Sequence, residues 1–199
     1  MIRQLIEKTR SVRRYRENEG IQEEELRELI DLARLGGSAR NGQSLKYMII
    51  TELKLCTRIF NLLKWAGYLK DWPGPDQGER PVAYIICLLD RKLCKGPERE
   101  AYFDLGIASQ NLLLGAAEKG IYGCRIASFS RDINKILYLD VNYKVMLVVA
   151  LGYPAEKVVL EKVKANGDIR YWRDKEGVHH VPKRSLDDIL VPVRKLPFE

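Results

Sequence analysis

The segment from Pro97 to Lys119 constrains the fold more than any other part of the chain. It reads PEREAYFDLGIASQNLLLGAAEK, with a proline and two glutamates at its start and Gly120 just past its end. Proline and acidic residues favour the first turn of a helix, and glycine favours the position after the last turn. Beyond Ala101 the residues are apolar on nearly every side of such a helix. A helix of that kind is buried on most sides, so we expect it at the centre of the fold.

Strand and helix patterns mix along the rest of the chain. Helical patterns cover residues 22–35, 55–67 and 130–138, and apolar runs typical of strands cover 46–51, 82–90, 122–129 and 144–153. No repeated β-α-β order is present that would require a parallel, doubly wound sheet. We therefore expect an α+β fold with a central mixed sheet of about four strands, flanked by helices.

The C-terminal part, from about residue 158 to 199, reads as an irregular arm that is basic and aromatic. Within it, residues 169–174 and 178–183 flank Lys-Glu-Gly, which is compatible with a hairpin. At 199 residues and 46% apolar composition, one domain over residues 1–199 is the expectation.

Several function classes are disfavoured by composition. No run approaches the roughly 18 consecutive apolar residues of a membrane span, and the start MIRQLIEKTR lacks the apolar core of a secretory signal, so we expect a cytoplasmic protein without a membrane partner. The four cysteines show no CxxC spacing, which argues against a zinc site or a disulfide framework. His179 and His180 would point to opposite faces of a strand, so no metal site is expected.

Basic residues concentrate at the N-terminus. The formal charge is +7, and residues 1–16 hold six basic side chains against Glu7 alone. In TRSVRRY, residues 9–15, three arginines fall within five positions. This pattern fits a solvated basic face, a nucleic-acid-binding arm, or a pocket for the phosphate of a small ligand.

Four segments in order resemble the FMN-dependent nitroreductase family over nearly the whole chain. They are RSVRRY, SARNGQSLKYMII, AYFDLGIASQNLLLGAAEKGIYGCRIASF and LVVALGYPAEK. They are similar to the family's Arg-Ser element, its Asn-x-Gln loop with the following strand, its long core helix with the strand behind it, and its Gly-Tyr-Pro-Ala turn. The resemblance implies a nitroreductase-like fold, FMN as the cofactor, and a homodimer in which the C-terminal arm wraps the partner subunit.

The basic residues then become candidates for the FMN phosphate, because an arginine fork suits a phosphate in a partly buried site. In an extended segment Ser11 and Arg13 share a face, whereas Arg14 points away and is expected to be a solvated charge. The expected phosphate or ribityl contacts are Arg10, Ser11, Arg13, Lys183 and Arg184.

Two further segments are candidates for the flavin ring. The loop residues Ser38, Ala39, Asn41 and Gln43 resemble the family loop that reaches the flavin of the other subunit, and the side-chain amides of Asn41 and Gln43 can both donate and accept hydrogen bonds. A plain polar turn with a left-handed asparagine is the alternative. The residues Ile126, Ala127 and Ser128 resemble the family segment that presents backbone N–H groups to the reactive nitrogen of the flavin. An ordinary buried strand is the alternative.

The chain also departs from the family pattern. Thr9 stands where many relatives have an arginine, and Gly37 and Ser44 stand where prolines are usual. These differences leave open how tightly FMN is held. The Pro- and Gly-rich stretch 68–81 is long for a connecting loop and is typical of a lid. Trp65, Tyr68 and Trp72 either stack on flat substrates at the open face of the flavin or serve in packing.

The function that these observations favour is an oxidoreductase. It would take a hydride from NADH or NADPH through FMN to a small acceptor such as a nitroaromatic, a quinone or free flavin. The chain has no catalytic Ser/His/Asp set and no GxGxxG fingerprint, as expected when the cofactor carries the chemistry. The alternatives are specialised chemistry on the same fold, such as reductive dehalogenation or substrate dehydrogenation, and a cofactor-free nucleic-acid-binding protein.

Overall fold

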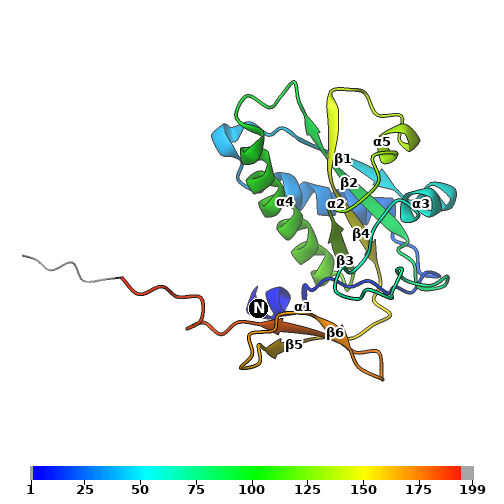
Figure 1. The fold of residues 1–199 in the computed structure, drawn as a ribbon. Coiled ribbons are helices and arrows are strands. Elements are labelled where there is room, and N and C mark those ends of the chain that lie inside the picture. Colours follow the sequence, from blue (N-terminus) through cyan, green and yellow to red (C-terminus); the bar gives the residue numbers. More distant parts are fainter. Residues whose placement is uncertain (1, 194–199) are drawn as a thin grey trace, which may run out of the picture. The chain divides into compact units, whose positions relative to one another are not determined.

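A computed structural model describes residues 2–193 of the chain. These residues fall into two compact units, one extending to Glu156 and one beginning at Lys157, and each is described by itself (Figure 1). The boundary lies one residue before the start of the expected C-terminal arm. The single-domain organisation stays an expectation.

A four-stranded sheet forms the first unit, with the order β1-β2-β4-β3. The strands are β1 (Leu45–Ile50), β2 (Ala83–Asp90), β3 (Tyr122–Ile126) and β4 (Tyr143–Gly152). The α+β class and the four strands are confirmed, but every ladder of this sheet is antiparallel, so the expectation of mixed strand directions was wrong for it. Strands β2 and β4 each run antiparallel to both of their neighbours in the sheet.

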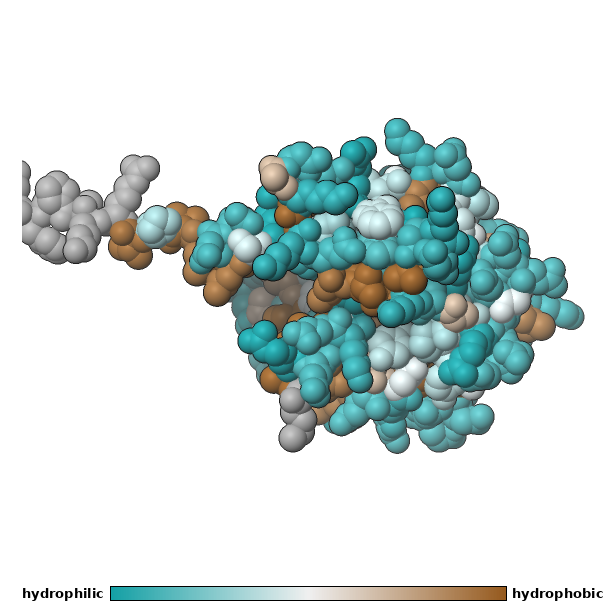
Figure 2. All heavy atoms as spheres, turned by 90° about the horizontal axis from the view of Figure 1, so that it is seen from below, coloured by the Kyte–Doolittle hydropathy of each residue, from teal (hydrophilic) through white to brown (hydrophobic). Residues whose placement is uncertain are grey.

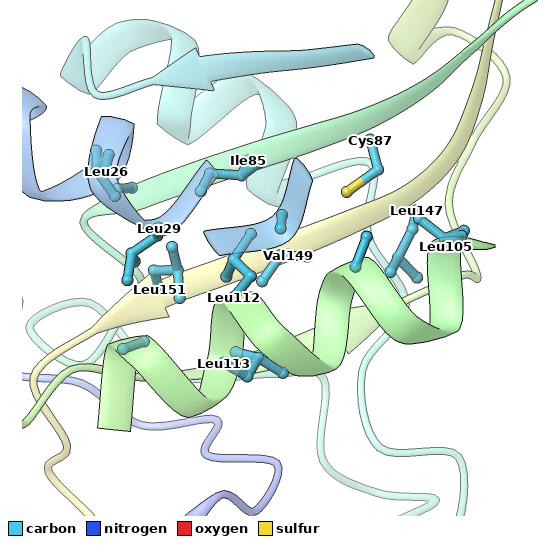
Figure 3. Packing of buried hydrophobic residues seen from close by; sticks show 14 of the residues in the cluster. Leu26, Leu29, Ile85, Cys87, Leu105, Leu112, Leu113, Leu147, Val149 and Leu151 are labelled. Atoms are coloured by element: carbon cyan, nitrogen blue, oxygen red, sulfur yellow. The ribbon is translucent and has the colours of Figure 1, made fainter. Parts of the chain in front are cut away.

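The long helix α4 (Glu98–Glu118) lies against this sheet, with Pro97 before its first turn and Lys119 after its last. Leu112 of α4 lies beside Val149 of β4 in the core, and Leu113 belongs to the same buried cluster (Figure 3). The opposite side of α4 exposes three large side chains, namely Tyr102, Phe103 and Ile107. The prediction that α4 is buried on most sides therefore holds for residues 108–117, none of which is exposed, whereas the N-terminal half of the helix is covered on one face only.

Helix α2 (Glu23–Arg34) completes the core. Three glutamates occupy its first turn and favour the positive end of the helix dipole, and the Glu25 carboxylate accepts from the Gln22 N–H at 3.1 Å. Leu26 and Leu29 are fully buried near Ile85 and Leu151 (Figure 3). Burying one leucine stabilises a fold by about 1.5–3 kcal/mol, so this face alone secures α2 to the unit.

The remaining helices of the first unit are short. They are α1 (Ile2–Lys8), the 3₁₀ turn η1 (Ala39–Asn41), α3 (Leu53–Phe60) and α5 (Ile133–Ile136). Helix α3 is shorter than the helical pattern at 55–67. It begins after Glu52, whose carboxylate accepts from the N–H groups of Lys54 and Leu55, and beyond Asn61 the chain turns irregular.

The second unit contains a sheet where an irregular arm was expected. Strand β7 (His179–Lys183) pairs in parallel with β5 (Val158–Lys162) and antiparallel with β6 (Trp172–Arg173). The hairpin predicted around Lys-Glu-Gly is confirmed, and Gly177 adopts a φ of 78° at its turn, a conformation that favours glycine.

Among residues 2–193, no helix is both long enough and apolar enough to cross a membrane. Cys56, Cys87 and Cys124 are buried free thiols and Cys94 is half-buried, which matches their positions in apolar stretches. Burial raises the pKa of the Cys56 thiol to about 11 and that of Cys87 to about 12.

Candidate functional site

The segment around Ser11 lies along the edge of β3. Ser11 forms a parallel bridge with Gly123, and the Val12 N–H donates to the Gly123 carbonyl at 3.2 Å. A Cβ atom at Gly123 would come within 2.6 Å of the Ala150 carbonyl oxygen and within 2.9 Å of Leu113. Glycine is therefore required where this edge of the sheet meets α4.

Tyr15 anchors the other end of the segment. Its side chain is fully buried, and its hydroxyl donates to the Val12 carbonyl at 2.5 Å. Gly152 makes room for the ring, because a Cβ there would lie 2.7 Å from Tyr15 Cδ1. Burial raises the pKa of Tyr15 well above its ordinary value, so the phenol stays neutral.

Two of the N-terminal arginines are engaged within the first unit. Arg13 is only 8% exposed, and its backbone N–H donates to the Glu156 carboxylate at 2.5 Å. Arg14 pairs with Glu79 at 3.1 Å and lies 5.9 Å from the ring centroid of Trp72. The expectation that Arg14 is a solvated charge was wrong, because an acidic partner from the 68–81 loop lies next to it. Neither side chain forms part of an exposed basic arm.

Arg10 lies just beyond the end of α1. Its Nη2 donates to the Ile6 carbonyl at 2.7 Å, which satisfies a carbonyl of the last turn. Its Nε is buried and has no hydrogen-bond partner among the described residues. Burial and the nearby Arg125 lower the pKa of Arg10. Thr9 donates its hydroxyl to the Leu5 carbonyl at 2.7 Å, so this donor is already used.

Arg125 was missed by the sequence reasoning. It projects from β3 toward α4, where Nη1 donates to Ser109 Oγ at 3.3 Å and Nη2 donates to Gln110 Oε1 at 3.1 Å. No ion pair joins Arg125 or Arg10 to a carboxylate within the described part of the chain. The signal was present, because strand alternation places Arg125 on the face opposite to Cys124 and Ile126.

The loop at residues 38–43 has a strained backbone. Arg40, Asn41 and Gln43 have φ values of 55°, 51° and 47°, a left-handed backbone conformation that residues other than glycine rarely adopt. Gln43 Nε2 donates to Asn41 Oδ1 at 3.1 Å, and the Gln43 N–H donates to Ser38 Oγ at 3.2 Å. The polar turn with a left-handed asparagine is thus present. Strain of this kind often accompanies a functional loop.

Two acidic residues of α4 fix this loop. The Ala39 N–H donates to the buried carboxylate of Asp104 at 2.9 Å, and Arg40 donates to both Glu100 oxygens at 3.0 and 3.1 Å. A cavity of about 190 Å³ lies beside the loop and is lined by residues that include Gly37, Ser38, Gln43, Ser44 and Asp104. Both contacts of the Arg40 guanidinium go to one carboxylate, and together with Asp104 they join the loop to α4.

The loop and the basic residues attach to α4 at different heights. The loop bonds to Asp104, whereas Arg125 bonds to Gln110, six residues further along. At 1.5 Å per residue, these anchor points are about 9 Å apart along the helix axis.

The segment after β3 is open. The strand ends at Ile126, which is buried, and Ala127 and Ser128 are exposed, so an ordinary buried strand does not describe them. The Ser128 carbonyl accepts from the Lys64 N–H at 2.9 Å, whereas the Ser128 N–H donates to no other residue within 2–193. This leaves the N–H of the exposed residue Ser128 available as a backbone donor.

The three candidate aromatic residues differ in exposure. Trp65 is 8% exposed and packs on Phe60 with ring centroids 5.7 Å apart, and Gly74 leaves no room beside it for a Cβ atom. Of the two expected roles, packing and substrate stacking, Trp65 therefore has the packing role. Tyr68 is half exposed, and Trp72 lies near Arg14. Their roles at a substrate stay predictions.

Lys183 and Arg184 belong to the second unit. Lys183 ends β7, and its carbonyl accepts from the Val163 N–H at 3.0 Å. Both side chains are exposed. Their expected contact with a phosphate stays a prediction.

Comparison with known proteins connects this arrangement to a family. The model of the Nitroreductase family matches residues 6–153. A Methanothermobacter thermautotrophicus protein with the provisional name NADH dehydrogenase/NAD(P)H nitroreductase is 27% identical over 158 residues, which is 77% of each chain. An Archaeoglobus fulgidus protein with the same provisional name is 25% identical over 77% of this chain and 85% of its own.

Solved structures share the fold. A provisionally named nitroreductase in complex with FMN from Desulfovibrio desulfuricans has a TM-score of 0.70 at 20% identity, over 100% of this chain and 98% of its own. A Nitroreductase Family Protein from Streptococcus pneumoniae has a TM-score of 0.69 at 16% identity, over 97% and 100% of the two chains. The matched segment contains the Ser11 segment, the strained loop, α4 and β3, and the chain belongs to the Nitroreductase family.

Proposed function

We propose that the chain is an FMN-dependent oxidoreductase that takes a hydride from NADH or NADPH and reduces a small acceptor such as a nitroaromatic, a quinone or free flavin. The observation that carries this proposal is the buried Nε of Arg10, which has no hydrogen-bond partner among the described residues and lies next to Ser11 at the edge of β3. A bound FMN supplies the hydride acceptor and donor, and the protein supplies binding and orientation.

One structural observation supports a fit between these residues and FMN. Arg10 keeps a buried Nε without a partner, and a phosphate oxygen is a suitable acceptor for it. Ser11 is exposed beside it and offers a hydroxyl donor. The free N–H of Ser128 on the neighbouring strand segment is a suitable donor to the flavin ring. Asn41 and Gln43 would approach the ring from a second subunit.

A homodimer is part of the proposal. The exposed face of α4 carries Tyr102, Phe103 and Ile107, and apolar faces of this kind mark association surfaces. The segment before residue 194 also exposes apolar side chains, seen in Figure 2 beside the grey residues; those with large exposed fractions are Leu186, Ile189, Leu190, Val191 and Val193. Both features support burial against a second copy.

The test begins with the purified full-length protein. Titration of FMN, followed by quenching of its fluorescence, should give saturable binding with one FMN per chain. NADH or NADPH should then bleach the bound flavin under anaerobic conditions, and a nitroaromatic or a quinone should restore its colour. Initial rates over a grid of donor and acceptor should give parallel double-reciprocal lines, because one pocket serves both substrates in turn.

Three results would count against the proposal. The first is a protein that binds no flavin, and the second is a flavin that neither nicotinamide reduces. The third is salt-sensitive binding of nucleic acid by a colourless protein, which would favour the cofactor-free alternative. An acceptor screen that yields turnover only with a halogenated or a saturated substrate would instead identify specialised chemistry on the same fold.

A further inference from the structure

The chain enters the 68–81 loop beside the segment that follows β3. The Lys64 N–H donates to the Ser128 carbonyl at 2.9 Å, and Leu63 forms an antiparallel bridge with Phe129. Ser128 is also the residue whose N–H is proposed to meet the flavin ring. The start of the loop is therefore attached next to one part of the proposed flavin site.

The same loop ends at the N-terminal basic segment. The Tyr15 N–H donates to the Glu79 carbonyl at 2.9 Å, and the Glu17 N–H donates to the Gly78 carbonyl at 3.3 Å. The Glu17 carboxylate accepts from the N–H groups of Gly78 and Arg80, at 2.5 and 3.3 Å. The loop thus spans from the candidate flavin-ring donor to the segment that carries the candidate phosphate contacts.

Between these ends the loop has little regular structure. No helix or strand lies between Phe60 and Ala83 in the described chain. Its internal backbone hydrogen bonds include turn contacts, such as the bond from the Trp72 N–H to the Leu69 carbonyl at 3.0 Å. A segment of this kind depends on contacts with its surroundings for a fixed position.

One side chain outside the loop contacts both its end and its middle. Arg14 Nε lies 3.1 Å from Glu79 Oε2, and Arg14 Cζ lies 5.9 Å from the ring centroid of Trp72. A guanidinium at this distance from an indole is attracted to the ring. The Arg14 side chain is 26% exposed, against 50% for Arg16 in its pair with Glu19, so solvent screens the charge of Arg14 less.

We infer that Arg14 is a positioning residue: its ion pair with Glu79 and its contact with Trp72 hold the 68–81 loop as a fixed wall of the acceptor pocket, on which a flat acceptor stacks. This role rests on the proposed function and adds to it a residue that acts through the loop. Arg14 takes no part in hydride transfer. A ligand that needs an ordered wall binds more weakly when fewer molecules have that wall in place. Loosening the loop should therefore raise the KM for the acceptor and leave kcat nearly unchanged.

The experiment uses the full-length protein with FMN and compares Arg14→Gln, Arg14→Glu and the charge reversal Arg14→Glu with Glu79→Arg. Arg16→Gln is the matched control, because it removes the same charge from the same segment and its partner Glu19 lies outside the loop. Amide exchange followed by mass spectrometry measures the order of the loop. Initial rates with a quinone or a nitroaromatic give KM and kcat, and circular dichroism checks the fold.

Arg14→Gln should accelerate amide exchange of the loop about threefold and raise the KM for the flat acceptor by a similar factor, because an ion pair of this exposure is worth a few-fold in an equilibrium. Arg14→Glu should have the larger effect, and the charge reversal should restore both quantities toward the wild type. Arg16→Gln should match the wild type. Unchanged loop exchange in Arg14→Gln, or a charge reversal no better than Arg14→Glu, would overturn the inference.

Trp72→Ala tests whether Arg14 acts through this ring. It should raise the KM by itself, and adding Arg14→Gln should then raise the KM further by less than about twofold, because coupled residues are not additive. Fully additive effects would overturn the inference. Trp72→Leu, which keeps an apolar side chain without a flat ring, replaces Trp72→Ala if that variant does not fold.

A wild type that bound no flavin would count against the proposed function and not against the contacts of Arg14. Amide exchange of the flavin-free protein would then decide the positioning role. Faster loop exchange in Arg14→Gln, reversed in the charge-reversal variant, would support it. Equal exchange in the wild type and Arg14→Gln would overturn it.

Discussion

The indole of Trp172 and the imidazole of His180 stack face to face, with centroids 3.9 Å apart and ring planes 4° apart. Carboxylates lie at both nitrogens of the same imidazole: Nδ1 is 2.5 Å from Glu161 Oε1 and Nε2 is 3.0 Å from Asp174 Oδ2. Only the protonated ring can donate to both. These contacts join the three strands of the second unit's sheet at one side chain.

The stability of this sheet should depend on pH. The hydrogen bond with Asp174, followed by that with Glu161, raises the pKa of His180 above 6.5, so its contribution is complete below the unfolded value of about 6.5 and is lost as pH rises through the folded pKa. Asp174 has a lowered pKa, mainly from the same bond, so its contribution is lost as pH falls through that folded pKa. The sheet should be most stable in mildly acidic solution.

Nuclear magnetic resonance checks this directly, because the chain has only two histidines. The His180 ring should titrate above 6.5, and amide exchange of β7 should become faster as pH rises through that value, beyond the intrinsic effect of pH. The variant His180→Gln should lose this extra dependence. A His180 pKa at or below 6.5 would contradict the prediction.

Gly123→Ala should destabilise the first unit. A Cβ atom at this position meets the Ala150 carbonyl at 2.6 Å, and backbone cannot move aside as a side-chain end can. Overpacking of this kind costs about 1–3 kcal/mol. Gly20→Ala is the control, because nothing lies within 4 Å of its added carbon. Urea denaturation should show a lower midpoint for Gly123→Ala alone, and equal midpoints for both variants would refute the steric argument.

Phe103→Glu should dissociate the proposed homodimer. Phe103 is 69% exposed on α4, so the charge is tolerated in a single chain but not in an apolar interface. Leu53→Glu is the matched control, because Leu53 is 70% exposed on α3. Sedimentation should give a monomer with reduced FMN content for Phe103→Glu and an intact dimer for Leu53→Glu. Dimers that survive both changes would place the interface elsewhere.

Substitutions of Trp65 and Tyr68 should distinguish a packing role from a role in substrate contact. Trp65→Ala empties a buried site and should cost about 3–5 kcal/mol of unfolding free energy. Tyr68→Ala removes a half-exposed ring and should leave the melting temperature nearly unchanged while raising the KM for a flat acceptor. An unchanged KM for nitroaromatics and quinones would remove Tyr68 from the substrate site.

The sequence by itself determined the elements of the first unit. The strands of the sheet and the helices α2 and α4 were predicted because hydrophobic periodicity and capping residues act within a few positions of the chain. The order of motifs also identified the family, and residue type offered the left-handed turn at Asn41 as an alternative to a flavin contact. Each of these features is encoded locally.

The tertiary structure alone decided which surfaces meet. Arg13 and Arg14 are adjacent in a basic stretch, yet one is buried near Glu156 and the other pairs with Glu79, residues that lie far away in sequence. The exposed face of α4 and the antiparallel sheet order depend on which elements pack together. Arg125 meets Ser109 and Gln110 only because β3 and α4 lie next to each other. Hydrophobic periodicity indicates how much apolar surface a segment must bury. Long-range packing decides which other segment buries that surface, and it also decides which charged side chains come together.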